Sequence, residues 1–220
     1  HRADGHHAAR FLPLAAQVTD TYEIEAPSPW RASRQTREVL TPLVSLLPSA
    51  VILSEGLFVW GWGERPFTVK SEGWFGGNTY AGGADKLGHL YSFYFQTKFY
   101  SWTMHNLGWS SKEAAFYGVL TAGAVGLSLE LGDGFGPFGF SFEDLAADAV
   151  GIFLASFHAN NETFSRFFAL RWQFWPTREY YSASNPNRFD ITSDYNGQTF
   201  YLSFKADGFE SLRERWGAKY

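Results

Sequence analysis

Residues 110–151 read SSKEAAFYGVLTAGAVGLSLELGDGFGPFGFSFEDLAADAVG and predict two apolar helices joined by a glycine-rich loop. Ser110 with Glu113 three positions later has the pattern of a capping box, which opens the first of these helices. We expect this helix to end near Leu131, because Gly132 follows it and glycine often terminates helices. The stretch therefore predicts a helix–loop–helix unit.

The second helix of this unit is predicted over Ser141–His158, with Asp144 at its third position. Along the preceding helix, Gly118, Ala122 and Gly126 recur every four residues and lie on one face. Small residues at this spacing let another helix approach closely, as is common in membrane bundles. The pattern favours close helix packing rather than isolated helices.

Two further apolar segments precede this unit. A helix is predicted over Ala84–Leu107, ended by Gly108. From Glu38 to Trp62 the chain is also apolar, with Pro42 suited to a first helical turn and Pro48 expected to kink or split the segment. The fold class predicted for the chain is mainly α, a bundle of about four apolar helices.

The C-terminal third changes to a period of two, which is typical of strands. Residues 166–175 predict one strand, and Phe189–Phe204 predicts a β-hairpin around Asn196-Gly197. Asn-Gly favours a type I′ turn, and that register would place Ile191 opposite Leu202. We therefore expect a small antiparallel β element after the bundle.

The chain is predicted to have three parts. Residues 1–37 form an irregular N-terminal arm, residues 38–160 a helical domain, and residues 161–220 an extension that contains the hairpin. A short amphipathic helix is expected at the end of the extension, over Phe209–Trp216.

The composition of the 220 residues excludes several classes of protein. Nine Trp, eleven Tyr and 22 Phe make 19% of the chain aromatic, and only 18% is charged, which argues against disorder. A net charge of −4 and a mean hydropathy of −0.22 give no sign of a nucleic-acid-binding surface. Because cysteine is absent, disulfides, thiolate metal ligands and cysteine nucleophiles are excluded within this sequence.

One group of polar residues in the predicted helices is not explained by packing alone. Each of the last three predicted helices carries acids or an imidazole near one end, and in the first and last of them two such residues are spaced i, i+4 on one face. The candidate residues are Asp85, His89, Glu130, Asp133, Asp144 and Asp148, supported by Lys86 and Ser141.

In an antiparallel bundle these helix ends meet, and the glycine-rich residues 61–84 would lie over them. Five carboxylates cannot all stay ionised and unpaired in a small buried volume. A divalent metal ion with oxygen and imidazole ligands is one solution, and a structural network of ion pairs and helix caps is the other. The sequence leaves both open.

The residues that carry these groups resemble a known family. The stretch EGWFGGNTYAGGADKLGH over 72–89, the Glu-x-x-Asp-Gly element at Glu130 and the Ser-x-x-Asp-x-x-x-Asp element at Ser141 resemble the YfiM-like family of uncharacterised bacterial periplasmic lipoproteins. The resemblance covers about residues 55 to 157. The chain is more distantly similar to VanZ-like membrane proteins, which share the Asp-Lys-x-x-His element. The resemblance implies a Gram-negative envelope location and implies no activity.

These observations predict an envelope protein on the periplasmic side, associated with a membrane through apolar helices and aromatic residues. A structural or binding role is the first hypothesis. The alternative is a metal-dependent hydrolase acting on an envelope lipid or glycan, in which the candidate acids divide between metal ligands and a general base. A membrane or envelope lipid is the expected partner, and the β element over residues 166–205 is a candidate surface for a protein partner.

Overall fold

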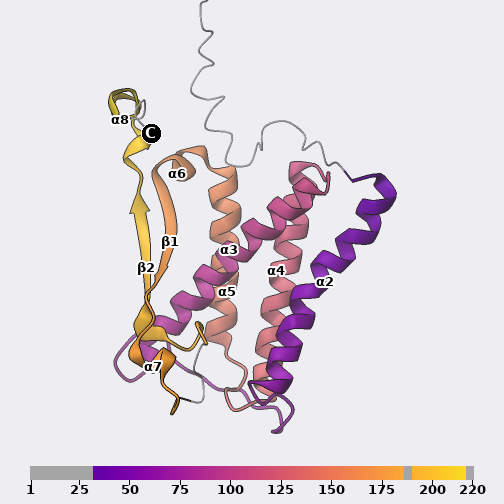
Figure 1. The fold of residues 1–220 in the computed structure, drawn as a ribbon, viewed down its shortest axis with the longest axis vertical. Coiled ribbons are helices and arrows are strands. Elements are labelled where there is room, and N and C mark those ends of the chain that lie inside the picture. The colour runs from indigo at the N-terminus through magenta and orange to yellow at the C-terminus, as the bar shows by residue number, and fades with distance from the viewer. Residues whose placement is uncertain (1–31, 186–189, 217–220) are drawn as a thin grey trace, which may run out of the picture.

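The computed structural model describes residues 32–185 and 190–216 and has the predicted mainly α architecture (Figure 1). Four long helices form a bundle, and a two-stranded sheet stands beside it. The long helices are α2 (Arg34–Phe58), α3 (Ala84–Asn106), α4 (Ser111–Gly134) and α5 (Phe142–Asn160). Helix α3 packs against both α4 and α5, and α2 packs on α4.

Successive helices of the bundle run in opposite directions (Figure 1). The start of α3, the end of α4 and the start of α5 therefore lie at the same end of the bundle, where α2 also ends. The chain between α2 and α3 crosses this end and closes with the 3₁₀ helix η2 (Tyr80–Gly83). Every predicted polar residue thus belongs to a segment that reaches this end.

Helix α2 departs from its predicted form at both prolines. It begins at Arg34 rather than Glu38, because Ser33 caps it by accepting a hydrogen bond from the backbone of Thr36 at 3.1 Å. Pro42 consequently lies in the helix interior, and Pro48 does not split the helix. A proline removes only one backbone hydrogen bond, and the remaining bonds and the contact with α4 keep the helix continuous.

The capping box of α4 is confirmed, but the predicted end at Leu131 is wrong. Glu113 accepts a hydrogen bond from the backbone N–H of Ser110 at 3.0 Å, and the Ser110 hydroxyl caps the helix in return. Helix α4 continues through Gly132 to Gly134. A Cβ at Gly132 would stand 2.4 Å from the ring of Trp62, so this glycine makes room for an aromatic ring rather than ending the helix.

Small residues bring the helices together as predicted. A Cβ added at Gly118 would stand 2.8 Å from the backbone oxygen of Thr97 on α3. Gly151 of α5 is equally restricted, because its Cβ would stand 2.2 Å from the backbone oxygen of Leu90. These contacts hold α3 close to both neighbours, around a core that includes Phe93.

The sheet corrects the predicted hairpin. Strand β1 (Phe168–Phe174) pairs antiparallel with β2 (Gln198–Phe204), so Phe204 lies opposite Phe168. Residues 190–194 form turns instead of a strand, Asn196-Gly197 falls in the 3₁₀ helix η3 (Tyr195–Gly197), and Phe189 lies outside the described residues.

The reason for this error is visible at Asp190. Its carboxylate accepts hydrogen bonds from the backbone N–H and the hydroxyl of Thr192, at 2.8 and 2.6 Å. Such bonds favour turns over strands, so the alternating pattern reflected turn-forming residues. The strand predicted over residues 166–175 is confirmed as β1, which pairs with a distant segment instead of being left beside a local hairpin.

Short elements complete the described chain. Helix α6 (Glu162–Phe167) leads into β1, α7 (Arg178–Tyr181) follows it, and η4 (Ala206–Gly208) connects β2 to the predicted C-terminal helix α8 (Glu210–Trp216). The predicted arm, residues 1–37, lies mostly outside the described residues, and the predicted domain limits stay predictions.

The outer surface of the bundle is apolar. Large side chains on all four helices point outward, including Leu46 at 66% exposure, Phe116 at 63% and Phe153 at 63%. Helices α2 and α4 are long and apolar enough to cross a membrane by length and composition, a test that core helices of soluble proteins and signal sequences also pass.

Candidate functional site

Lys86 is the centre of a buried ion-pair network at the polar end of the bundle. Its side chain is 2% exposed, and its ammonium group lies 2.8 Å from Glu72, 3.0 Å from Asp85 and 2.6 Å from Asp144. The ammonium group donates hydrogen bonds to Glu72 and Asp85 and forms an ion pair with Asp144. The network joins the glycine-rich segment, α3 and α5 through one cation.

The three carboxylates and Lys86 change each other's pKa values. Burial alone lowers the pKa of Lys86, but hydrogen bonds to Asp144, Glu72 and Asp85 outweigh it and raise the pKa above the usual lysine value. Burial raises the pKa of Glu72, a shift that the bond to Lys86 only partly offsets. Burial also acts to raise the pKa of Asp85, but the charge of His89 and the bonds to Lys86 and Tyr195 lower it overall. Lys86 is therefore a firmly charged centre.

His89 lies one turn after Lys86's neighbour Asp85 and faces two carboxylates. Its Nδ1 lies 2.8 Å from Oδ1 of Asp148, and its Nε2 lies 3.9 Å from Oδ1 of Asp85. Burial alone lowers the pKa of His89, but the hydrogen bond and charge of Asp148 outweigh it and raise the pKa to about 10. The second Asp148 oxygen, Oδ2, is buried and has no hydrogen-bond partner among the described residues.

Glu130 and Ser141 connect α4 to the start of α5. Glu130 is 1% exposed and accepts a hydrogen bond from the backbone N–H of Ser141 at 3.0 Å. The Ser141 hydroxyl accepts from the backbone N–H of Asp144 at 3.2 Å, which is the predicted N-cap. Asp144 is thus both a residue of the capped first turn and a partner of Lys86.

Asp133 lies at the same end but has a different neighbour. Its carboxylate accepts a hydrogen bond from the indole N–H of Trp62 at 2.7 Å. Trp62 is wedged between Gly56 of α2 and Gly132 of α4, where a Cβ at either glycine would overlap its ring. Asp133 therefore fixes the ring that joins α2 to α4.

The C-terminal extension reaches the network through Tyr195. Its hydroxyl donates to Oδ1 of Asp85 at 2.8 Å, and its ring packs edge-on against Tyr80. Burial and the nearby charge of Asp85 raise the pKa of Tyr195, so its hydroxyl stays a donor. The extension is thereby tied to the bundle across more than a hundred residues of sequence.

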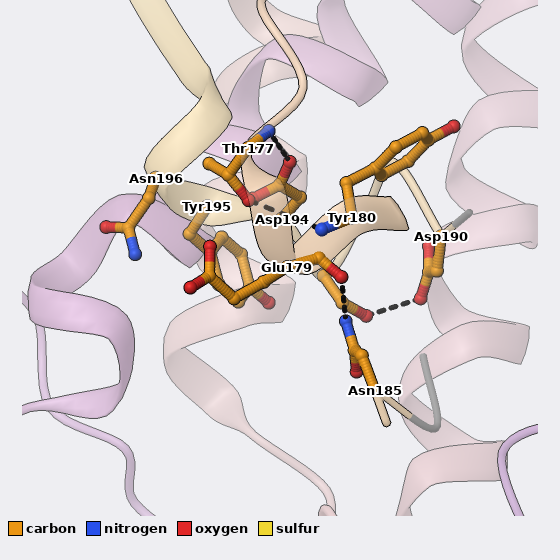
Figure 2. Close-up of a pocket in the computed structure, with 9 residues that line it drawn as sticks. Thr177, Glu179, Tyr180, Asn185, Asp190, Asp194, Tyr195 and Asn196 are labelled. Carbon is orange, nitrogen blue, oxygen red and sulfur yellow. Dashed lines mark hydrogen bonds between the residues drawn. The ribbon is translucent and has the colours of Figure 1, made fainter. Parts of the chain in front are cut away.

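Tyr195 also lines a polar cavity of about 150 Å³ between α7 and η3 (Figure 2). Asp194, in its wall, accepts hydrogen bonds from the backbone and hydroxyl of Thr177 at 2.9 and 2.8 Å. The remaining residues of its lining are Glu179, Tyr180, Asn185, Asp190, Ser193 and Asn196. The cavity is small, polar and rich in acceptors.

Sequence reasoning missed Glu72, Tyr195 and Trp62. Glu72 lies within the glycine-rich segment, and a lone acid in a loop carries no periodic signal. Tyr195 lies in the predicted hairpin next to Asn196-Gly197, where no role is expected for its hydroxyl. Trp62 and Glu72 come from the segment between α2 and α3, and Tyr195 comes from the C-terminal extension. Their partners lie on other elements, so only the packed structure brings them together.

The fold and the network define a bundle of apolar helices with a buried ion-pair network at one end. Residues 71–160 match the model of a family described as predicted periplasmic lipoproteins (DUF2279). This range contains α3, α4, α5, all five candidate acids and the candidate imidazole. No match was found among curated proteins or among solved structures.

The match supports the predicted resemblance to uncharacterised periplasmic lipoproteins, and the narrower YfiM-like and VanZ-like resemblances stay predictions. The protein is assigned to the bacterial cell envelope, on the periplasmic side and associated with the membrane.

Proposed function

We propose that this envelope protein has a structural and binding role, in which the network around Lys86 fixes the polar end of a lipid-embedded bundle. The observation that carries the proposal is the complete pairing of Lys86. Its ammonium group forms ion pairs with carboxylates from the glycine-rich segment, α3 and α5. Removing one partner of such a buried pair strands a charge, so the arrangement holds these segments in one geometry.

The outer surface of the bundle supports the lipid part of this proposal. Residues 39–54 of α2 and 114–129 of α4 contain no charged side chain. At about 1.5 Å per residue each stretch measures about 24 Å, which covers most of the roughly 30 Å hydrocarbon core of a typical bilayer. The network lies beyond these stretches, at the depth where polar headgroups would meet the protein.

The position of aromatic residues agrees with this arrangement. Trp60, Trp62 and Trp74 lie in the segment that crosses the polar end of the bundle, and the indole of Trp74 is half exposed. Tryptophan is enriched where a membrane meets water, because its ring is apolar and its N–H is polar. We therefore propose that this end of the bundle lies at a membrane surface.

A carbonate extraction tests the lipid embedding. Membranes from a Gram-negative bacterium expressing the full chain are washed with alkaline carbonate, and the chain is expected to stay in the pellet. Complete release into the supernatant would contradict the proposal. A known peripheral protein and a known integral protein in the same sample serve as controls.

The sheet supports the binding part of the role. Leu202 and Phe204 of β2 are largely exposed. Exposed apolar side chains on a strand suit contact with another protein. We propose this strand as the surface for a protein partner. A pull-down compares the unmodified chain with the double variant Leu202→Ser and Phe204→Ser. If both capture the same partner equally well, the proposal is contradicted.

A metal-dependent hydrolase acting on an envelope lipid or glycan is the second candidate. One observation favours it: Tyr195 lines the polar cavity and also donates to Asp85 of the network. A sugar ring bound in the cavity would thus lie beside a residue that contacts a candidate acid. The deep burial of Glu130 and Asp148 favours the structural role instead.

A turnover assay separates the two candidates. The purified chain is incubated with phosphatidylethanolamine and phosphatidylglycerol vesicles and with peptidoglycan fragments, and products are followed by mass spectrometry. The structural proposal predicts no turnover. Product formation that disappears in an Asp148→Asn variant would establish the hydrolase in its place.

A further inference from the structure

A second polar centre lies beside the Lys86 network, where α3, α4 and α5 meet. His89, Glu130 and Asp148 each offer one ligand atom, and these three atoms lie within 4.8 Å of one another. The three residues come from three different helices, so the site is fixed by the packing of the bundle. Glu130 is 1% exposed and Asp148 is 2% exposed.

An independent observation at Asp148 indicates that a ligand is expected here. Its Oδ2 atom is buried and has no hydrogen-bond partner among the described residues. This oxygen points at α4, because a Cβ at Gly126 would stand 2.8 Å from it. Gly126 lies one turn before Glu130 on the same helix face. A buried carboxylate oxygen without a partner is costly, and a cation at this position would satisfy it.

The charges of the neighbourhood point the same way. Lys86 is already ion-paired with Glu72, Asp85 and Asp144. Among the described residues, His89 is therefore the cationic group that lies next to both Glu130 and Asp148. One imidazolium balances only one ionised carboxylate, so further positive charge is needed for both Glu130 and Asp148 to be ionised in this buried centre.

We propose that His89, Glu130 and Asp148 bind a divalent first-row transition ion such as Zn²⁺. One imidazole nitrogen with two carboxylate oxygens is a ligand set that Zn²⁺ accepts, whereas Ca²⁺ and Mg²⁺ prefer oxygen alone. Binding would release the Nδ1 proton of His89 to solvent, so that Nδ1 becomes a ligand beside the Asp148 carboxylate. The Nε2–H of His89 then faces Asp85, which is the arrangement of a carboxylate that orients a metal-bound histidine.

This site goes beyond the proposed structural role and does not depend on the lipid embedding. The bound ion would join α3, α4 and α5 at a point that Lys86 does not reach. The proposed site consists of His89, Glu130 and Asp148. A second set of three residues, Asp85, His89 and Asp144, offers an alternative position for the ion next to Lys86.

The test uses the full chain purified in detergent and stripped of metal with a chelator. ZnCl₂ is titrated by calorimetry, and bound zinc is counted by elemental analysis after desalting. We expect saturable binding of one ion per chain and a raised melting temperature. Glu130→Gln and Asp148→Asn should each weaken binding by at least about tenfold. Glu130→Gln keeps an oxygen that can accept from Ser141, so helical circular dichroism should stay unchanged.

Glu143→Gln is the matched control, because this acid is on the first turn of α5, is only partly buried and belongs to neither set of three residues. Its zinc affinity should equal that of the unmodified chain. Absence of saturable binding by the folded chain would overturn the proposal. Binding that survives Glu130→Gln but is lost in Asp144→Asn would also overturn it, by assigning the ion to the Lys86 centre. Neither result bears on the carbonate extraction.

Discussion

The polar end of the bundle and its outer surface invert the usual distribution of side chains. At the polar end, Lys86, Glu130 and Asp148 are each at most 2% exposed. On the outer surface, Phe116 and Phe153 are 63% exposed, and Leu46 is 66% exposed. In water both features cost free energy, because charges lose hydration and large apolar groups stay hydrated.

This difference is what we expect if the polar end is stabilised by specific ion pairs and the outer surface by contact with an apolar medium. Charges are tolerated inside because each meets an opposite charge or a backbone donor at a fixed distance. Apolar groups are tolerated outside when the surrounding medium is itself apolar, as lipid is. We therefore expect stability to depend on exact side-chain geometry in the interior, and only on side-chain polarity on the outer surface. Four predictions test this contrast.

The largest effect is expected when the central cation is removed. Lys86→Met leaves Glu72, Asp85 and Asp144 buried without their shared partner and should lower the free energy of unfolding by about 3–5 kcal/mol. Denaturant titration in detergent, followed by far-ultraviolet circular dichroism, measures it. Lys70→Met removes an exposed lysine of the glycine-rich segment and should change stability by less than about 0.5 kcal/mol. Equal losses in the two variants would show that Lys86 has no special structural role.

A methyl group added inside the bundle should come next. Gly151→Ala places a Cβ 2.2 Å from the backbone oxygen of Leu90 and should destabilise the chain by about 1–3 kcal/mol. Gly123→Ala on α4 is the matched control, since its Cβ would meet nothing within 4 Å. This second variant should be neutral or more stable by up to about 1 kcal/mol, because alanine favours helix over glycine. The melting temperatures of the two variants are compared with that of the unmodified chain. A higher melting temperature for Gly151→Ala would refute the close packing of α5 on α3.

A smaller effect is expected from one hydrogen bond between the extension and the network. Tyr195→Phe removes the donor to Asp85 and should cost about 1–2 kcal/mol. Limited proteolysis should then cut the extension faster, while the bundle stays intact. Tyr201→Phe removes a similar bond, to Gln173 on the exposed sheet, and should cost less than about 0.5 kcal/mol. If Tyr201→Phe has the larger effect, the contact of Tyr195 does not hold the extension.

The smallest effect is expected on the outer surface. Phe153→Leu changes the shape of an exposed side chain but keeps it apolar, so the free energy of unfolding should change by less than about 0.5 kcal/mol. Phe93→Leu makes the same change in the core and should cost about 1 kcal/mol or more. Thermal unfolding in detergent compares them. A similar loss in both variants would mean that Phe153 packs against a specific protein surface rather than fluid lipid.

Several features of this fold were readable from the sequence because they depend on neighbours within a few residues. The Ser110–Glu113 capping box, the Ser141 N-cap and the start of α3 at Ala84 are set by local hydrogen bonds and backbone preferences. Gly118 and Gly126 likewise predicted close packing, because the absence of a Cβ follows directly from the residue type. The polar helix ends followed from the alternating direction of successive helices.

Other features depended on which distant segments meet, and the tertiary structure alone decided them. The pairing of β1 with β2 replaced a local hairpin, because the turn bonds of Asp190 competed with a strand over residues 190–194. Glu72 joined the network through a loop without periodicity, and Gly132 proved to accommodate Trp62 instead of ending α4. Residue types and spacings record local preferences. The partner that satisfies a buried charge or fills the space beside a glycine is selected by packing across the whole chain.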